Sequence, residues 1–155
     1  MAGENMGYNA RNGYNTYREI GVKTASRGSL VVMLYDGAVS HLKDAISLIT
    51  DSGKIEPNNM EKYGRHIQKV TDIIAELQAT LNMDEGGEIA QNLMSLYIFF
   101  NKQLLDNAIR HDRENLSKVL SMLSDLRDSW AVAASSLANT EVNVSSPVPS
   151  LSITG

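Results

Sequence analysis

His66 and Lys69 come nearest, by type and spacing, to a known reactive arrangement in this sequence. Phosphotransfer through histidine needs an accessible ring nitrogen as the nucleophile and a nearby cation to hold the phosphate. Positions three apart lie on one face of a helix, so this pair could meet both requirements. Val70 follows where such modules usually carry a small residue, and this spacing often arises by chance. Phosphotransfer through His66 is therefore retained as the alternative function.

The three histidines, His41, His66 and His111, do not form a known metal motif. Di-iron helical bundles place a glutamate three residues before a histidine ligand. The residues at those positions here are not acidic: Ala38, Tyr63 and Ala108. The chain also has no cysteine, which excludes thiolate ligands and disulfides. His41 falls on an apolar helix face and is expected to be a core histidine with a hydrogen-bond partner. We expect no metal site, no cofactor and no enzymatic activity, because no set of nucleophile, base and acid occurs at a helical spacing.

The distribution of charged and apolar residues limits the classes of partner that the chain is expected to bind. Its 155 residues carry a net charge of −4. Residues 1–29 carry +2, so the remaining residues carry −6. An acidic body argues against nucleic-acid binding, because phosphate contacts need a basic face. The longest apolar run, residues 30–35, is far shorter than the roughly 18 residues of a membrane span. The N-terminus has no apolar signal segment, so the expected location is the cytoplasm.

Apolar periodicity predicts an all-α fold, an antiparallel four-helix bundle with short connections. Helices are predicted over residues 26–51, 57–81, 87–110 and 112–138. Ser26 and Asp112 are suitable N-caps, and Pro57 suits a first helical position. The predicted organisation is a partly ordered N-terminal arm over residues 1–25, the bundle over residues 26–138 and a flexible tail over residues 139–155.

The four predicted helices differ in the width of their apolar faces. The second and fourth have narrow stripes with alternating spacings of three and four: Met60, Tyr63, Ile67, Val70, Ile74, Leu77 and Leu81, and Leu116, Val119, Leu123, Leu126, Trp130, Ala133 and Leu137. The first has an apolar arc of roughly 180–200°, against the roughly 100° that one core requires. In the third, the expected core residues are Ile89, Leu93, Leu96, Tyr97, Phe100 and Leu104, while Phe99 falls on the polar side.

The surplus apolar margins of the first and third helices have two interpretations. They could line grooves that receive a partner, or a large core and the N-terminal arm could cover them. Gly37 and Asp36 of the first helix also have two interpretations each, one of which involves a partner. Gly37 interrupts this helix, and close packing against a neighbouring helix is slightly favoured over close approach of a partner. Asp36 is expected to be a solvated surface carboxylate, with anchoring of the arm or of a partner as the alternative.

Four blocks of the sequence, taken in chain order, form a pattern that can be compared with known families. The first is Tyr14-Asn15-Thr16-Tyr17 with Val22, Thr24, Ala25 and Ser26, and the second is the run from Leu30 to Ala38. The third is Gly86-Gly87-Glu88-Ile89-Ala90 with Asn92, Leu93, Leu96 and Tyr97. The fourth is Leu123, Leu126, Arg127 and Trp130. In their order and spacing over about residues 14 to 135, these blocks together resemble the flagellar secretion chaperones of the FliS family.

The resemblance implies a non-catalytic antiparallel bundle that binds the disordered C-terminal segment of flagellin before export. Such a client would lay apolar anchors into successive grooves, which would hide the surface that polymerises. Helical-wheel position then predicts the client-facing residues: Val31, Tyr35, Val39 and Ile46 on the first helix, and Met94, Ile98, Leu105 and Ile109 on the third. Whether an export-gate component or a co-chaperone also docks is left open. So is the alternative of a plain structural bundle that dimerises through the wide arcs.

The resemblance also implies a second role for the N-terminal arm. Apolar residues of the arm would cover a groove in the free protein and move aside for the client: Tyr14, Tyr17, Ile20 and Val22. A lid of this kind lowers apparent affinity in proportion to its occupancy. An ordinary N-terminal strap without a regulatory role is the alternative.

Overall fold

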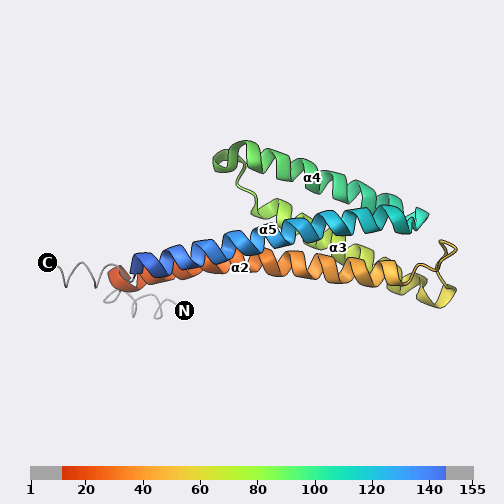
Figure 1. Cartoon of the computed structure of the whole chain (residues 1–155), viewed down its shortest axis with the longest axis horizontal. Helices are drawn as coiled ribbons and strands as arrows, with labels where there is room; N and C mark the ends of the chain where they lie inside the picture. The colour runs from red at the N-terminus through yellow and green to blue at the C-terminus, as the bar shows by residue number, and fades with distance from the viewer. Residues whose placement is uncertain (1–11, 146–155) are drawn as a thin grey trace, which may run out of the picture. The chain divides into compact units, whose positions relative to one another are not determined.

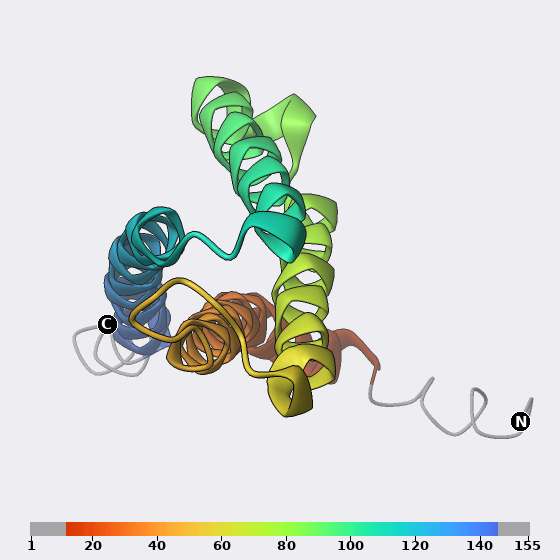
Figure 2. The same ribbon diagram turned by 90° about the vertical axis from the view of Figure 1, so that its right-hand side faces the viewer.

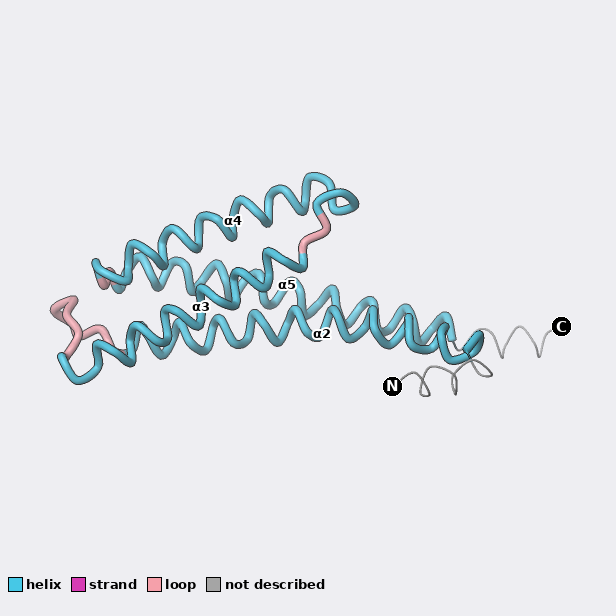
Figure 3. Tube along the Cα trace, turned by 180° about the vertical axis from the view of Figure 1, so that it is seen from behind, coloured by secondary structure: helices cyan, strands magenta, loops and turns pink. Residues whose placement is uncertain are grey.

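Four long helices account for most of the chain, and their bounds follow the apolar periodicity. The computed structural model describes the backbone of residues 12–145 and the side chains of residues 27–136. The helices are α2 (Asn12–Ser47), α3 (Met60–Thr80), α4 (Met83–Arg110) and α5 (Arg113–Ser145), with one short 3-10 turn, η2 (Pro57–Asn59). No strand occurs within residues 12–145 (Figure 3). The prediction of an all-α four-helix bundle is confirmed.

The ends of the outer helices differ from the prediction. Ser26 does not cap the first helix, because α2 already begins at Asn12. Its final turn ends at Ser47 rather than at residue 51. The last helix continues past the predicted end at Ala138 and runs to Ser145. Local turn-forming residues such as Gly and Asn lower helix propensity by only about 1 kcal/mol each, and tertiary context overrides a preference of that size.

The chain divides into two compact units. One unit is residues 31–129, and the other combines residues from before position 31 with residues from position 130 onward. In the first unit each helix runs antiparallel to the one before it, and α3 and α4 lie side by side (Figures 1 and 2). In the second unit α2 and α5 approach closely at Gly28, where an added Cβ would lie 3.2 Å from the Cβ of Ala134.

The core of residues 31–129 is built from the predicted apolar stripes. On α3 the buried residues are Tyr63, Ile67, Val70, Ile74 and Leu77, and on α5 they are Leu116, Val119 and Leu123. On α4, Tyr97, Phe100 and Leu104 are buried. Ile89, which was expected in the core, is 72% exposed, so that prediction is wrong. A helical wheel treats a helix as endless, whereas Ile89 lies in the first turn after a kink, where fewer neighbours can cover it.

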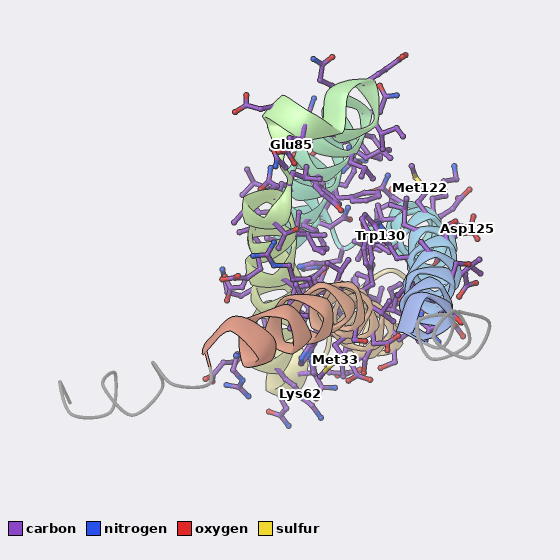
Figure 4. All side chains as sticks on the ribbon, turned by 90° about the vertical axis from the view of Figure 1, so that its left-hand side faces the viewer. Met33, Lys62, Glu85, Met122, Asp125 and Trp130 are labelled. Carbon is purple, nitrogen blue, oxygen red and sulfur yellow. The ribbon has the colours of Figure 1, made fainter. Side chains whose placement is uncertain are left out.

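Side-chain hydrogen bonds fix both ends of α4. At its start the Asn82 side chain accepts from the backbone N–H of Glu85 at 3.1 Å and donates to the Glu85 carboxylate at 3.1 Å (Figure 4 labels Glu85). This reciprocal pairing satisfies an otherwise unpaired donor of the first turn. Gly87 then breaks the helical backbone, with φ 56° and ψ −134°. The main body of α4 therefore begins near Gly87, as predicted.

The turn between α4 and α5 is fixed by the buried side chain of Asn107. Its amide nitrogen donates to the carbonyl of Gln103 at 2.9 Å and to the side chain of Asn115 at 2.7 Å. Its amide oxygen accepts from the backbone N–H of Asp112 at 2.7 Å. The Asp112 carboxylate accepts from the backbone N–H of Asn115, which confirms Asp112 as the N-cap of the last helix. The chain turns through His111 in the left-handed conformation, at φ 54°.

Packing against α2 settles the two residues that sequence alone left ambiguous. A Cβ added to Gly37 would lie 3.1 Å from the terminal methyl of Ile73 on α3, which confirms close helix packing. Asp36 is an exposed surface carboxylate, as expected, and it also accepts from the guanidinium of Arg127 on α5 at 2.7 Å. A wheel cannot find this ion pair, since it depends on the register between two helices.

Candidate functional site

One face of α4 carries large apolar side chains that the fold does not bury. Met94, Ile98, Leu105 and Ile109 share this face, because spacings of four, seven and four residues return to nearly the same angle on a helix. We call these four residues the apolar stripe. Ile98 is 58% exposed, Leu105 73% and Ile109 82%. The buried residues of α4 point in another direction, so the stripe is surplus to the core.

Polar groups border the stripe on the side of α3. Met94 is half-buried, and its sulfur accepts from the Gln78 amide at 3.5 Å. The Gln78 amide oxygen accepts from Asn101 at 3.2 Å. The Asn101 side-chain oxygen is buried and has no hydrogen-bond partner within the described residues. A buried acceptor without a partner is costly to the fold.

The predicted residues on α2 are less accessible than those on α4. Val31, Val39 and Ile46 are half-buried at the margin of the core. Tyr35 is fully buried, and its hydroxyl is hydrogen-bonded to that of Tyr97. Contact of Tyr35 with a client therefore stays a prediction, and it would require this side chain to leave its buried position. Tyrosine combines a large apolar ring with one polar atom, and a wheel cannot show that a hydroxyl on α4 would satisfy that atom inside the core.

The predicted cap residues, Tyr14, Tyr17, Ile20 and Val22, lie within the first turns of α2. Their side chains lie outside the described residues. Phe99 faces the polar side of α4, as expected, and is 42% exposed.

The structure brings together two histidines that sequence analysis treated separately. His41 on α2 and His66 on α3 face each other, with their Nδ1 atoms 3.0 Å apart and their rings 5.3 Å apart. Asp44, one turn after His41, completes a group whose ligand atoms all lie within 4.8 Å of one another. Both histidines are half-buried and Asp44 is exposed. In the sequence, both histidines lie at or near the edge of the apolar face of their helix, and these two helices are consecutive. That position could have indicated the group, but only if the register of the two helices were known.

The surroundings of His66 set its protonation. Desolvation by burial lowers the pKa of His66, and the charges of His41, Lys62 and Arg65 lower it further. The Asp44 carboxylate opposes this lowering of the pKa. A carboxylate so close to His66 would also repel a transferred phosphate, so nothing in this geometry favours the phosphotransfer alternative.

Burial also perturbs two tyrosines of the core. Desolvation raises the pKa of Tyr63 to about 12, and its hydroxyl donates to the backbone carbonyl of Asn107. Desolvation raises the pKa of Tyr97, and its hydrogen bond with Tyr35 partly counters that effect. These groups hold α3 to α4 and α2 to α4, and both are inaccessible to a substrate in this conformation.

None of the described helices combines the length and the apolar character that crossing a bilayer would need.

Comparison with known proteins places the chain in a family. Residues 10–137 match the family of the flagellar protein FliS. The flagellar secretion chaperone FliS of Bacillus subtilis is 30% identical over 126 residues, covering 81% of this chain and 89% of the relative. The protein of that name in Escherichia coli is 31% identical over 126 residues, covering 78% and 88%. The one in Salmonella typhimurium is 34% identical over 113 residues, covering 72% and 79%. Since the match spans most of the chain and most of each relative, this protein belongs to the FliS family of flagellar proteins.

Proposed function

We propose that this protein is a cytoplasmic export chaperone that binds the disordered C-terminal segment of flagellin. Binding would prevent premature polymerisation and keep the client competent for flagellar type III export. The protein would act by stoichiometric binding, without catalysis and without a cofactor. Membership of a family whose relatives are named flagellar secretion chaperones supports the export role.

The observation that carries the proposal is the apolar stripe of α4. Ile98, Leu105 and Ile109 are each more than half exposed on one helix face. Covering one such side chain completely contributes about 1.5–3 kcal/mol. An amphipathic helix or extended segment with apolar anchors at matching intervals would cover several of them at once. A client that folds on binding also has an ordering cost of about 2–5 kcal/mol or more, so several anchors are needed.

The remaining predicted contacts have supporting roles in this proposal. Val31, Val39 and Ile46 offer partly exposed apolar surface on α2, and Met94 offers it on α4. Tyr35 is fully buried here, so it would join these contacts only if its side chain left the core. The cap role of Tyr14, Tyr17, Ile20 and Val22 rests on the family resemblance, as does docking of an export-gate component or a co-chaperone.

The first test is calorimetric titration of the full chain with the C-terminal segment of flagellin from the same cell. We expect one client per chaperone and a dissociation constant of about 1 μM or tighter, equivalent to about −8 kcal/mol. A large negative heat-capacity change is expected, because apolar surface is buried. Absence of binding heat and of co-elution would contradict the proposal.

Variants of the stripe provide the residue-level test. Leu105→Gln and Ile109→Gln should each weaken client binding by about tenfold or more, because each removes an apolar anchor. Glutamine is a good helix former, so helicity should not change. Ile89→Gln is the matched control, since Ile89 is 72% exposed on the same helix but faces away from the stripe. Equal losses for all three variants would show that the stripe has no special role.

A further inference from the structure

A group of three metal-ligand side chains lies apart from the apolar stripe, on α2 and α3. It consists of His41 and Asp44, one turn apart on α2, and His66 on α3. We propose that these residues bind one Zn²⁺ ion or a similar divalent transition metal, with the remaining coordination position open to water. The proposal is independent of client binding.

The spacing of the nitrogen atoms fits two ligands of one ion. The Nδ1 atoms of His41 and His66 are 3.0 Å apart. Two nitrogens bound to zinc at about 2.0–2.1 Å lie about 3.3 Å apart in a tetrahedral site and about 2.9 Å apart in an octahedral one. The observed distance therefore needs little adjustment of either ring. Asp44 has a ligand oxygen within 4.8 Å of one ring nitrogen of each histidine, and as an exposed side chain it can move closer by a change of rotamer.

The helical framework also fits a preformed site. Residues three apart on a helix project from the same face, which places His41 and Asp44 on the side where α3 presents His66. All three residues belong to the compact unit of residues 31–129, so no rearrangement between parts of the chain is required. The half-buried rings limit water access, while the exposed Asp44 leaves an entry path for the ion.

The donor set indicates which metals can bind. Two imidazoles and one carboxylate suit zinc, copper and nickel, whereas calcium and magnesium prefer oxygen ligands throughout. Imidazole coordinates metals in its neutral form. The Asp44 carboxylate attracts a cation, whereas the charges of Lys62 and Arg65 nearby oppose it. A moderate affinity is therefore expected rather than that of a four-ligand structural zinc site.

A direct hydrogen bond between the two rings would also give a distance of 3.0 Å, so the test must detect the ion itself. We would titrate untagged, metal-free full-length protein with ZnCl2 by calorimetry. The expected result is one ion per chain with a dissociation constant of about 10 μM or tighter. His41→Gln and His66→Gln should each weaken binding by at least tenfold, and Asp44→Asn by a smaller factor. His111→Asn, which alters the third histidine and keeps a residue that tolerates the left-handed backbone, should bind as the parent does.

A measurement on the unaltered protein tests the proposal even if the histidine variants do not fold. In proton NMR spectra, the ring signals of His41 and His66 should shift or broaden on addition of ZnCl2, while those of His111 should not. Absence of zinc binding would overturn the proposal. So would unchanged affinity in folded His41→Gln and His66→Gln variants, or equal NMR effects on all three histidines.

Discussion

At the scale of single residues, buried polar atoms show how strictly the fold satisfies hydrogen bonds. Asn107 is the one polar residue classed as buried among the described side chains. Its amide makes three hydrogen bonds, and its carbonyl accepts from Tyr63. Removing one partner of such a group costs about 1–3 kcal/mol. The unpartnered oxygen of Asn101 is the exception, and it lies beside the proposed client contacts.

The lowered pKa of His66 predicts how stability depends on pH. The unfolded chain binds a proton at this residue with an ordinary pKa of about 6.5, whereas the folded chain binds it only at lower pH. The free energy of unfolding should therefore fall as the pH drops through about 6.5, and this contribution should level off below the folded-state pKa. Urea unfolding between pH 7.5 and pH 5, in a chelating buffer without metal ions, measures the effect.

The control for this pH dependence is His66→Gln, which cannot titrate. Its free energy of unfolding should vary less over the same pH range, because His66 no longer contributes. Identical pH profiles for the two proteins would show that the surroundings of His66 do not disfavour its charged form.

At the scale of elements, two glycines of the first compact unit should respond to alanine in opposite ways. Gly87 has φ 56° and ψ −134°, a conformation that side chains with a Cβ rarely adopt. Gly87→Ala should lower the free energy of unfolding by about 1–3 kcal/mol. Gly64 lies inside α3 with no atom near its would-be Cβ, so Gly64→Ala should raise it by about 0.5–1 kcal/mol.

Urea unfolding of both glycine variants beside the parent protein tests this pair. Each is the control for the other, because the chemical change is the same. Destabilisation by both would mean that α3 has a packing requirement at Gly64. Stabilisation by both would mean that the kink at Gly87 is not needed by the fold.

The element scale also shows what periodicity can and cannot predict. The apolar periodicity of α3 predicted that Tyr63, Ile67 and Val70 lie in the core, and all three are buried. Capping chemistry placed Asp112 correctly, because an N-cap depends on residues within one turn. The start of α2 was missed, because continuation of a helix through weak helix formers depends on what packs against it. Pairings such as His41 with His66 depend on the register of two helices, which one helix's pattern does not contain.

The proposed contacts were predicted unevenly for a related reason. A wheel separates a polar face from an apolar one, and Ile98, Leu105 and Ile109 are indeed exposed. It cannot say how far a neighbouring helix covers an apolar margin. Tyr35 is therefore fully buried although its angle on α2 differs little from that of the half-buried Val39.

At the scale of the whole molecule, burial is concentrated in one of the two compact units. Every buried residue among the described side chains lies between Tyr35 and Leu123, inside residues 31–129. Amide hydrogen exchange reports local opening, which is rarest where the buried contacts are densest. Amides of residues 63–77 and 97–104 should therefore exchange most slowly, and those of residues 131–136, whose side chains are exposed or half-buried, should exchange faster.

Hydrogen exchange followed by mass spectrometry checks this distribution, after correction for intrinsic exchange rates. Equal protection of residues 131–136 and of the two core segments would contradict it. Such a result would mean that the helical ends in the second unit open only when the whole molecule unfolds.

The turn that leads out of α2 has a practical use. Two backbone contacts hold its ends together. The N–H of Thr50 donates to the carbonyl of Lys54 at 2.7 Å, and Ile49 pairs with Ile55 in an antiparallel bridge. The residues between them, from Asp51 to Lys54, are exposed. Because lengthening a loop costs only about 0.6 kcal/mol for each doubling, a spliced peptide there would barely disturb the fold. Because the protein has no cysteine, Ser52→Cys would also create a unique attachment point for a dye or a surface. Ser52 belongs neither to the apolar stripe nor to the group of His41, Asp44 and His66.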